Sequence, residues 1–448
     1  MVEPRSRPVG DTERSWCRAV RSGTGVAVLA LRTSSPPDIP RLQAALHELQ
    51  SSHPILRSRL HSNAAATSFS FLTSPAPSIK IRSETLPSSS AADPLRHVLE
   101  LELNRTDAWR HPASDDDLLL ATLYGVHGGA STRVLSLTLH VSACDRTTAL
   151  LLLRELLALM AGGGGAVDNN INNEHREEAS LAMEDLVPPD KAKKPIWTRG
   201  LDMLAYSLTS LRLTTLKFID TKHPRLSHVL RLQLNQNHTT QLLAGCKWSG
   251  IKLCGALVAA GLMAAHCSKR SSRKYGVVTF TDCRSSLEPP LSDNFGFYHS
   301  AILNTHEVKG GESMWELAKR TYEAFAKSKR CNKHLSDMAD LSFLMCKAIE
   351  NPGLTPSSSL RTSVMAVFED TVVDNGGSLQ RQVGVEDYVG CASVHGVGPS
   401  IGIFDTVRDG SLDCVCVYPA PLHSRQQVQE ILDNMKAILI QGANTYKE

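Results

Sequence analysis

Long apolar runs are missing from this sequence. The two most apolar stretches are 148–161, which Arg154 and Glu155 interrupt, and 254–267. Both are shorter than the roughly 20 residues that a helix needs to cross a bilayer. The start of the chain also lacks the apolar core that a secretory signal carries. We therefore expect a cytoplasmic protein with no membrane span, in which both stretches form buried helices.

The sequence also has little net charge and no closely paired cysteines of the Cys-x-x-Cys type. The 48 basic residues nearly balance the 45 acidic ones, so the formal net charge of +3 gives no reason to expect nucleic acid as a partner. The eleven cysteines include no Cys-x-x-Cys pair, which fits buried thiols in a reducing compartment better than a disulfide framework. The 17 histidines show no ligand-like spacing, so we expect no metal site.

What the sequence does contain is a strand that delivers a histidine to its end. Every second residue from Leu135 to Leu139 is leucine, and the polar residues between them, ending at His140, share the opposite face. An imidazole at a strand end can take a proton from a substrate hydroxyl, amine or thiol near neutral pH. A histidine that bonds only to nearby backbone is the alternative. Asp145 then precedes a helix to Met160, where an acidic residue favours the positive end of the helix dipole.

The length of 448 residues is sufficient for two domains of ordinary size. The glycine run from Gly162 to Gly165 opens a polar stretch to about Ala179 that is typical of a linker. We therefore place one domain at residues 1–180 and a second at 181–448. Periodicity predicts strands at 25–32, 78–82, 118–124, 133–140, 227–234, 276–281, 364–369 and 402–406, and helices at 39–51, 93–103, 145–160, 197–218, 238–246, 252–267, 314–329 and 428–439. Asp409-Gly410 predicts a hairpin turn.

Three segments stand in a recognisable order. His53-Pro-Ile-Leu-Arg57 follows an amphipathic helix, the His140 strand comes next, and Asp282-Cys-Arg284 and Asp293-Asn-Phe-Gly-Phe297 lie in the second half. Together they resemble the CoA-dependent acyltransferase superfamily, which includes chloramphenicol acetyltransferase, peptide-synthetase condensation domains, alcohol acetyltransferases and plant BAHD acyltransferases. The resemblance covers most of the chain. It implies an α/β fold of two chloramphenicol-acetyltransferase-like subdomains, each a mixed sheet packed with helices, meeting at a central tunnel.

The histidine motif departs from the family pattern. Aligning the family's His-His-x-x-x-Asp-Gly on Asp145 puts His140 at the first histidine and Val141 at the second, which is the catalytic one. Arg146 replaces the glycine, and four residues separate His140 from Asp145 where the family has three. Either the turn is one residue longer and His140 still reaches the tunnel, or the base is lost.

The resemblance also implies roles for the other motif residues. Arg284 would form a salt bridge with Asp145 and tie the two subdomains together, which makes Asp145 structural. Asp282 is two residues from Arg284 and shares its face in an extended segment. Asp282, Asn294 and Gly296 would shape the tunnel at a distance from the chemistry, and the glycine permits a close backbone approach.

Weaker signals point elsewhere. Gly398-Pro-Ser400-Ile-Gly402 matches the Gly-x-Ser-x-Gly pattern of serine hydrolases, but a hairpin follows where that motif needs a helix. The glycine run at 162–165 is followed by no Lys-Ser/Thr, which argues against a phosphate loop. His127 and His299 are candidate substitute bases, His299 because it closely follows the Asn-Phe-Gly segment.

By this resemblance the chain is an acyltransferase with an acyl-CoA-type thioester as co-substrate and no permanently bound cofactor. His140 would deprotonate an alcohol or amine acceptor, which attacks the thioester carbonyl; such base catalysis contributes about 10²–10⁴-fold. The alternative is a catalytically degenerate, condensation-domain-like protein that binds a ligand or a partner protein, which Val141 and Arg146 favour. In either case we expect a monomer.

The first prediction concerns the Arg284 side chain. If it forms a buried bidentate pair with Asp145, its removal leaves an uncompensated charge and should cost about 3–5 kcal/mol of unfolding free energy. Thermal unfolding of Arg284→Ala should therefore show a midpoint well below that of a surface substitution. An unchanged midpoint would contradict the pairing.

Overall fold

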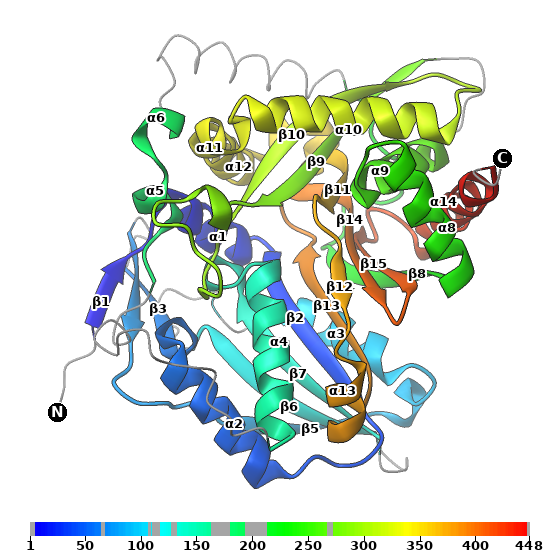
Figure 1. Cartoon of the computed structure of the whole chain (residues 1–448). Coiled ribbons are helices and arrows are strands. Elements are labelled where there is room, and N and C mark those ends of the chain that lie inside the picture. The colour runs from blue at the N-terminus through cyan, green and yellow to red at the C-terminus, as the bar shows by residue number, and fades with distance from the viewer. Residues whose placement is uncertain are drawn as a thin grey trace. The chain divides into compact units, whose positions relative to one another are not determined.

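The computed structural model describes residues 5–63, 68–105, 109, 117–126, 132–162, 180–192, 213–266 and 272–445 (Figure 1). The chain divides into two compact units that are interleaved in sequence. Unit 1 comprises Met1–Leu186, Pro289–Tyr298 and Gly376–Ser393, and unit 2 comprises Val187–Glu288, His299–Asn375 and Val394–Glu448. The predicted boundary after residue 180 lies close to the division after Leu186, but no sequence pattern pointed to the two later segments that return to unit 1.

Unit 1 is built on a five-stranded mixed sheet. Its strand order is β13 (Val385–Val394), β2 (Thr24–Thr33), β7 (Arg133–His140), β6 (Leu119–Val126) and β5 (Ile81–Leu86). β7 pairs antiparallel with β2 and β6, whereas β5 pairs parallel with β6. A second, three-stranded sheet consists of β1 (Arg5–Pro8), β4 (Phe69–Thr73) and β3 (Ser58–Ser62).

Helices cover both faces of the larger sheet. α2 (Ile39–Ser52) and α4 (Arg146–Met160) lie side by side on one face, and their leucines share a core with the leucines of β7 (Figure 1). α3 (Pro94–Leu103) packs against β2 and β7 from the other face. Unit 1 also contains α1 (Asp11–Arg21), α5 (Met183–Leu186) and α13 (Gly377–Val383).

The alternation predicted for the histidine strand is confirmed. Leu135, Leu137 and Leu139 are buried in the core shared with α2 and α4. The polar face is covered too, because Thr138 Oγ1 donates to Glu102 Oε2 of α3 at 2.9 Å. His140 therefore ends a strand with two buried faces.

Unit 2 is built on a seven-stranded mixed sheet. The order along it is β10 (His299–Val308), β9 (Arg273–Asp282), β11 (Arg361–Phe368), β14 (Gly398–Arg408), β15 (Ser411–Ala420) and β8 (Leu226–Leu234), and β12 (Val372–Asp374) pairs with β14 outside this path. β11 runs parallel to β9 and β14, and the other neighbours along the path are antiparallel. Asp409 and Gly410, with φ of 47° and 76°, join β14 to β15, so the predicted hairpin is confirmed.

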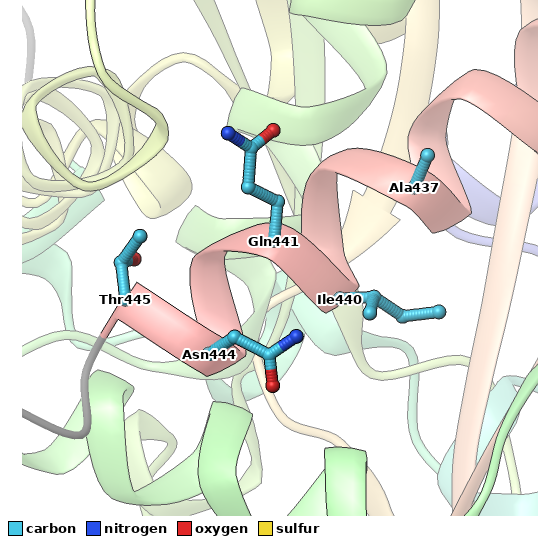
Figure 2. A pocket seen from close by; sticks show the side chains of 5 residues that line it. All are labelled: Ala437, Ile440, Gln441, Asn444 and Thr445. Carbon is cyan, nitrogen blue, oxygen red and sulfur yellow. The ribbon is translucent and has the colours of Figure 1, made fainter.

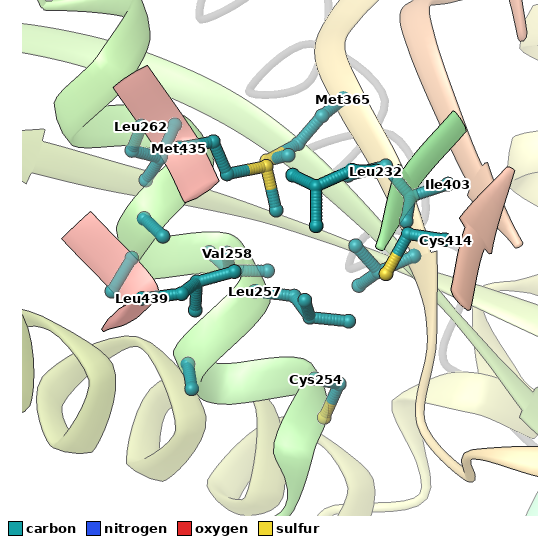
Figure 3. Close-up of a cluster of buried hydrophobic side chains, with 14 of the residues drawn as sticks. Leu232, Cys254, Leu257, Val258, Leu262, Met365, Ile403, Cys414, Met435 and Leu439 are labelled. Carbon is teal, nitrogen blue, oxygen red and sulfur yellow. The ribbon is translucent and has the colours of Figure 1, made fainter. Parts of the chain in front are cut away.

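The main helices of unit 2 are α8 (Gln236–Trp248), α9 (Leu253–Ala265), α10 (Met314–Arg330) and α14 (Arg425–Thr445). α9 is buried along most of its length and packs against α10 and α14. Figure 3 shows Leu257 and Leu262 of α9 in one cluster with Met435 and Leu439 of α14. The predicted apolar stripe of the closing helix therefore faces this core. Shorter helices are α6 (Pro189–Ala192), α11 (Lys333–Ser336) and α12 (Met338–Glu350).

Two predicted elements differ from the structure. The helix predicted for 197–218 is wrong over its described end, because residues 213–218 contain no helix and Thr214 N–H instead donates to the Lys274 carbonyl of β9 at 2.7 Å. The rest of that segment, 197–212, lies outside the described residues, as does most of the predicted linker. The strand predicted at 78–82 begins only at Ile81 and continues to Leu86, since the preceding residues contribute backbone groups to α2 side chains.

No single helix in the described part of the chain is long and apolar enough to cross a membrane. α8 and α9 reach such a length only when taken together, and they are bent by 106° at the break between them.

Candidate active site at the end of β7

The turn that follows β7 holds the ring of His140. Its backbone forms a 3₁₀ turn over Val141–Ala143. Ser142 N–H donates to His140 Nδ1 at 3.2 Å, and the Ser142 hydroxyl lies 2.7 Å from the same nitrogen. Because a backbone N–H can only donate, Nδ1 is an acceptor, and in the neutral ring Nε2 carries the proton. Within the described residues Nε2 has no hydrogen-bond partner.

The surroundings of His140 keep its ring neutral. The residue is only 1% exposed, and the Trp109 ring approaches it edge-on with centroids 5.3 Å apart. Burial is the main cause that lowers the pKa of His140, to about 3, and the positive charge of Arg21 acts in the same direction. A neutral ring with a protonated Nε2 is a hydrogen-bond donor at that atom, not a base.

The helix that brings Arg21 to this ring was not predicted. α1 packs against the 3₁₀ turn and against β2. Its sequence carries the signals of a helix, with Asp11 and Glu13 in the first turn and Arg18 and Arg21 in the last. Its few large apolar residues hid the helical period, so charge placement was the signal that could have found it.

Val141, which the motif resemblance aligns with a catalytic histidine, is packed into unit 1. A Cβ atom added to Gly25 would lie 2.6 Å from Val141 Cγ1 and 3.2 Å from Trp16 Cε3. Gly25 also has a φ of 100°, which a side chain disfavours. The close approach of β2 to Val141 therefore depends on this glycine, and Val141 contributes packing in place of a titratable group.

Asp145 joins two distant segments of the chain. It caps α4, because Thr148 N–H donates to its Oδ1 at 2.8 Å, and its Oδ2 accepts the N–H of Tyr298 at 2.8 Å. Its own N–H donates to the Gly296 carbonyl at 3.1 Å. Both carboxylate oxygens thus bind backbone, which supports the structural role expected for Asp145. Arg146, at the family's glycine position, is the first residue of α4 and is half-buried.

The Asn-Phe-Gly segment docks at the start of α4. Thr148 Oγ1 donates to the Gly296 carbonyl at 2.8 Å and accepts the Gly296 N–H at 3.1 Å. Gly296 has a φ of 154°, and a Cβ there would lie 2.8 Å from the Tyr298 ring. Asn294, by contrast, is exposed. Within unit 1 the glycine of this motif therefore shapes the backbone at the Asp145 cap.

The His-Pro motif meets the same segment. The His53 ring stacks on Phe295 with centroids 3.6 Å apart, and its Nε2 lies 2.7 Å from Glu155 Oε2 of α4. Arg57 donates to the carbonyls of Gln50 and Ser74 at 2.7 and 2.8 Å. Three motifs that are far apart in sequence thus converge on α4.

Asp282 and Arg284 lie in unit 2, at the end of β9. Arg284 is 4% exposed on its side chain, and its Nη1 lies 3.1 Å from Asp282 Oδ2. Arg284 N–H also donates to Asp282 Oδ1 at 2.9 Å, so backbone and side chain of Arg284 both contact this carboxylate. A pair between Arg284 and Asp145 would join the two units and stays a prediction.

The remaining candidates are placed as follows. His299 begins β10 opposite Asp282 in the β9 register and is buried, and His127 lies outside the described residues. Ser400 is fully buried inside β14, with no strand-to-helix elbow, so the Gly-x-Ser-x-Gly match is not a nucleophile site. Among the described residues, no three His, Cys, Asp or Glu side chains are grouped to hold a metal.

Two hollows in unit 2 are lined by described residues, and both lack catalytic groups. One is open and follows the last turns of α14, where Figure 2 shows Ala437, Ile440, Gln441, Asn444 and Thr445. The other is a small internal void beside Gly261, among apolar side chains of the core in Figure 3. Neither resembles an acyl-transfer site.

Known proteins resemble this chain in structure but not in sequence. No protein-family model and no curated protein matches the sequence. Solved structures do match over almost the whole chain. The TRI3 trichothecene 15-O-acetyltransferase from Fusarium sporotrichioides is 12% identical, with a TM-score of 0.72, covering 98% of this chain and 95% of its own. The condensation domain of the monacolin K polyketide synthase MokA is 11% identical, with a TM-score of 0.65 and coverage of 99% and 98%.

This is the fold of the CoA-dependent acyltransferase superfamily. A third structure with this fold is the X-domain from teicoplanin biosynthesis in complex with OxyB, at 15% identity, a TM-score of 0.61 and coverage of 99% and 94%. The predicted α/β fold of the acyltransferase type is therefore confirmed. Identities this low establish the fold alone.

The second prediction tests the Asp145 cap. Asp145→Ala removes the acceptor of a helix-capping bond and leaves the buried Tyr298 N–H without its partner, which together should cost about 2–4 kcal/mol of unfolding free energy. Asp38→Ala removes an N-cap acceptor at the exposed start of α2 and should cost about 1 kcal/mol. Urea denaturation of both variants provides the comparison, and equal losses would contradict the bridging role.

The third prediction concerns pH and His140. Its folded pKa of about 3 lies below the ordinary 6.5, so between these values the unfolded chain binds a proton that the folded chain does not. The free energy of unfolding should therefore fall as pH is lowered through this window, by up to about 1.4 kcal/mol per pH unit from His140. His140→Gln keeps an acceptor for Ser142 N–H and should flatten the slope in urea denaturation between pH 4 and 7. The exposed His97→Gln is the control, and identical slopes for both would refute the assignment.

Proposed function

We propose that this chain is a binding module with the acyltransferase fold, in which His140 is a structural residue and does not act as a general base. The observation that carries the proposal is the hydrogen bond from Ser142 N–H to His140 Nδ1. It leaves the proton on Nε2, the nitrogen that a substrate hydroxyl or amine would need as an acceptor.

Restoring a base at this ring would be costly. For Nε2 to be unprotonated, Nδ1 would have to carry the proton, and the donated bond from Ser142 N–H would be lost, although the Ser142 hydroxyl could turn to accept from Nδ1–H. A base with a pKa near 3 is also poorly matched to proton transfer near pH 7, where an efficient base has a pKa close to the working pH. Val141 offers no substitute at the neighbouring position.

The comparisons support a role in binding as well as in catalysis. The X-domain with this fold was solved in complex with another protein, OxyB, which shows that the fold can present a protein-binding surface. For this chain, an acyl-CoA-type thioester is the small ligand to test first, because the resemblance of the motifs implies it.

The second candidate is an acyltransferase that transfers an acyl group from such a thioester to an alcohol or amine. One observation favours it: TRI3, an acetyltransferase, has this fold. The convergence of the His53, Asp145 and Gly296 segments on α4 also shows that motif residues outside the catalytic position are built into the structure.

The fourth prediction separates the two candidates. Incubation with a panel of acyl-CoA donors and simple alcohol or amine acceptors should release no free thiol above background, for wild type and His140→Gln alike. Isothermal titration with the same donors measures binding without turnover. An active acetyltransferase of the same fold, assayed in parallel, shows that the panel can report transfer.

Two results would count against the binding module. Thiol release by the wild type that His140→Gln abolishes would establish His140 as the base. Release that persists in His140→Gln would show an enzyme that uses another group.

A further inference from the structure

Two arginines and a histidine lie at one end of the unit 2 sheet. Arg361 is the first residue of β11, Arg225 directly precedes β8, and His423 follows the end of β15. β11 is parallel to β14, and β15 is antiparallel to both β14 and β8, so these strand ends lie together. We refer to Arg225 and Arg361 as the cationic cluster, beside which His423 lies.

The Arg361 guanidinium is buried, and no carboxylate among the described residues pairs with it. Arg361 is 2% exposed, and its side chain donates to three backbone carbonyls. Nε donates to Ser359 at 3.1 Å, and Nη1 donates to Val394 at 2.9 Å and to Pro399. Nη2 is buried and has no hydrogen-bond partner among the described residues. A buried cation of this kind is normally paired with an anion.

Arg225 brings a second positive charge to the same carbonyl. Its Nη1 donates to the Ser359 carbonyl at 2.5 Å and its Nη2 to the Ser358 carbonyl at 3.2 Å. Within the described part of the chain, both arginines donate to backbone only and neither has a carboxylate partner. Burial lowers the pKa of both guanidinium groups, and the charge of Arg225 adds to the effect on Arg361.

His423 adds a third polar group that faces these charges. It is fully buried, and its Nδ1–H donates to the Lys217 carbonyl at 3.3 Å. Its Nε2 has no partner among the described residues. Burial, followed by the charges of Arg361 and Arg225, lowers its pKa to about 4. The ring is therefore neutral near pH 7, and an anion beside the cluster would relieve the repulsion between the two guanidinium groups.

We propose that the cationic cluster binds a phosphate-type oxyanion, either free or as the phosphate group of a small ligand. Two guanidinium groups offer the planar, charge-assisted donors that suit a tetrahedral dianion. Arg225 is half-buried, and Ser357 and Ser358 are exposed, so solvent reaches the loop beside the cluster. Both serines have left-handed backbone, with φ of 51°, and strain of this kind is often found at functional loops.

The site is separate from the motif residues of this unit. β9 and β11 are parallel, so Asp282, which ends β9, lies toward the far end of β11 from Arg361. With eight residues, β11 spans about 23 Å between its ends. The outcome of an anion-binding test is therefore independent of any role of His140.

Isothermal titration of the full chain with inorganic phosphate, at ionic strength held constant with chloride, is the direct test. Phosphate should bind with a measurable heat and raise the thermal midpoint, and chloride should do neither. Glycerol 3-phosphate is the second probe: binding of both indicates a site for a phosphate group of a ligand, and binding of inorganic phosphate alone indicates a site for the free ion.

Arg225→Gln is the decisive variant, because Arg225 is half-buried and bonds only to loop carbonyls, so the fold should persist. It should weaken phosphate binding by about 10- to 100-fold, the effect of one charge-assisted contact. Lys222→Gln removes the same charge from a nearby exposed position and should leave affinity unchanged. Arg361→Gln should abolish binding if the variant folds. No phosphate heat in the wild type, or equal affinities in Arg225→Gln and Lys222→Gln, would overturn the proposal.

Discussion

The carboxylate of Asp145 is the interaction on which the architecture of unit 1 depends. One oxygen caps α4 and the other accepts the Tyr298 N–H, so the helix start and the returning 289–298 segment are held by the same group. Thr148 and Gly296 add two bonds between the same partners. An unsatisfied backbone group in this buried place would cost about 1–3 kcal/mol. Asp145 therefore binds the 289–298 segment to the start of α4 within unit 1.

The same turn decides the chemistry of His140. The 3₁₀ turn that carries the chain from β7 to Asp145 directs Ser142 N–H at Nδ1, and this one bond selects the tautomer. If a neighbouring group accepted a hydrogen bond from Nδ1–H, Nε2 would be unprotonated and could act as a base. A backbone N–H can only donate, so the Ser142 N–H does not allow this tautomer. The turn can therefore keep its structure whether or not His140 is a base, because none of the bonds that stabilise it needs an unprotonated Nε2.

Local patterns predicted much of this structure, and apart from α1 the features of the site that they missed depend on long-range contacts. The leucine alternation before His140, the Asp145 cap and the Asp409-Gly410 turn are set by neighbouring residues, so the sequence was sufficient for them. The return of Phe295 and Gly296 to α4 depends on hydrogen bonds from backbone N–H groups to side chains about 150 positions away. No periodicity encodes such contacts. The tautomer of His140 depended on the exact path of a turn that the sequence left open.

Two of the buried polar atoms that have no hydrogen-bond partner among the described residues are His140 Nε2 at the end of β7 and Arg361 Nη2 at the start of β11. They differ in the kind of ligand that they could bind. The Nε2 of His140 belongs to a neutral ring enclosed by Trp109, so it costs the free energy of one unmet hydrogen bond. The Nη2 of Arg361 belongs to a charged group with a second cation beside it, and an unpaired buried charge is much more costly. The unmet hydrogen bond of the neutral His140 ring therefore costs the fold little stability. The buried charge of Arg361 persists more readily where an anion offsets it, which is why the end of the unit 2 sheet, and not the histidine motif, carries the stronger physical argument for a ligand.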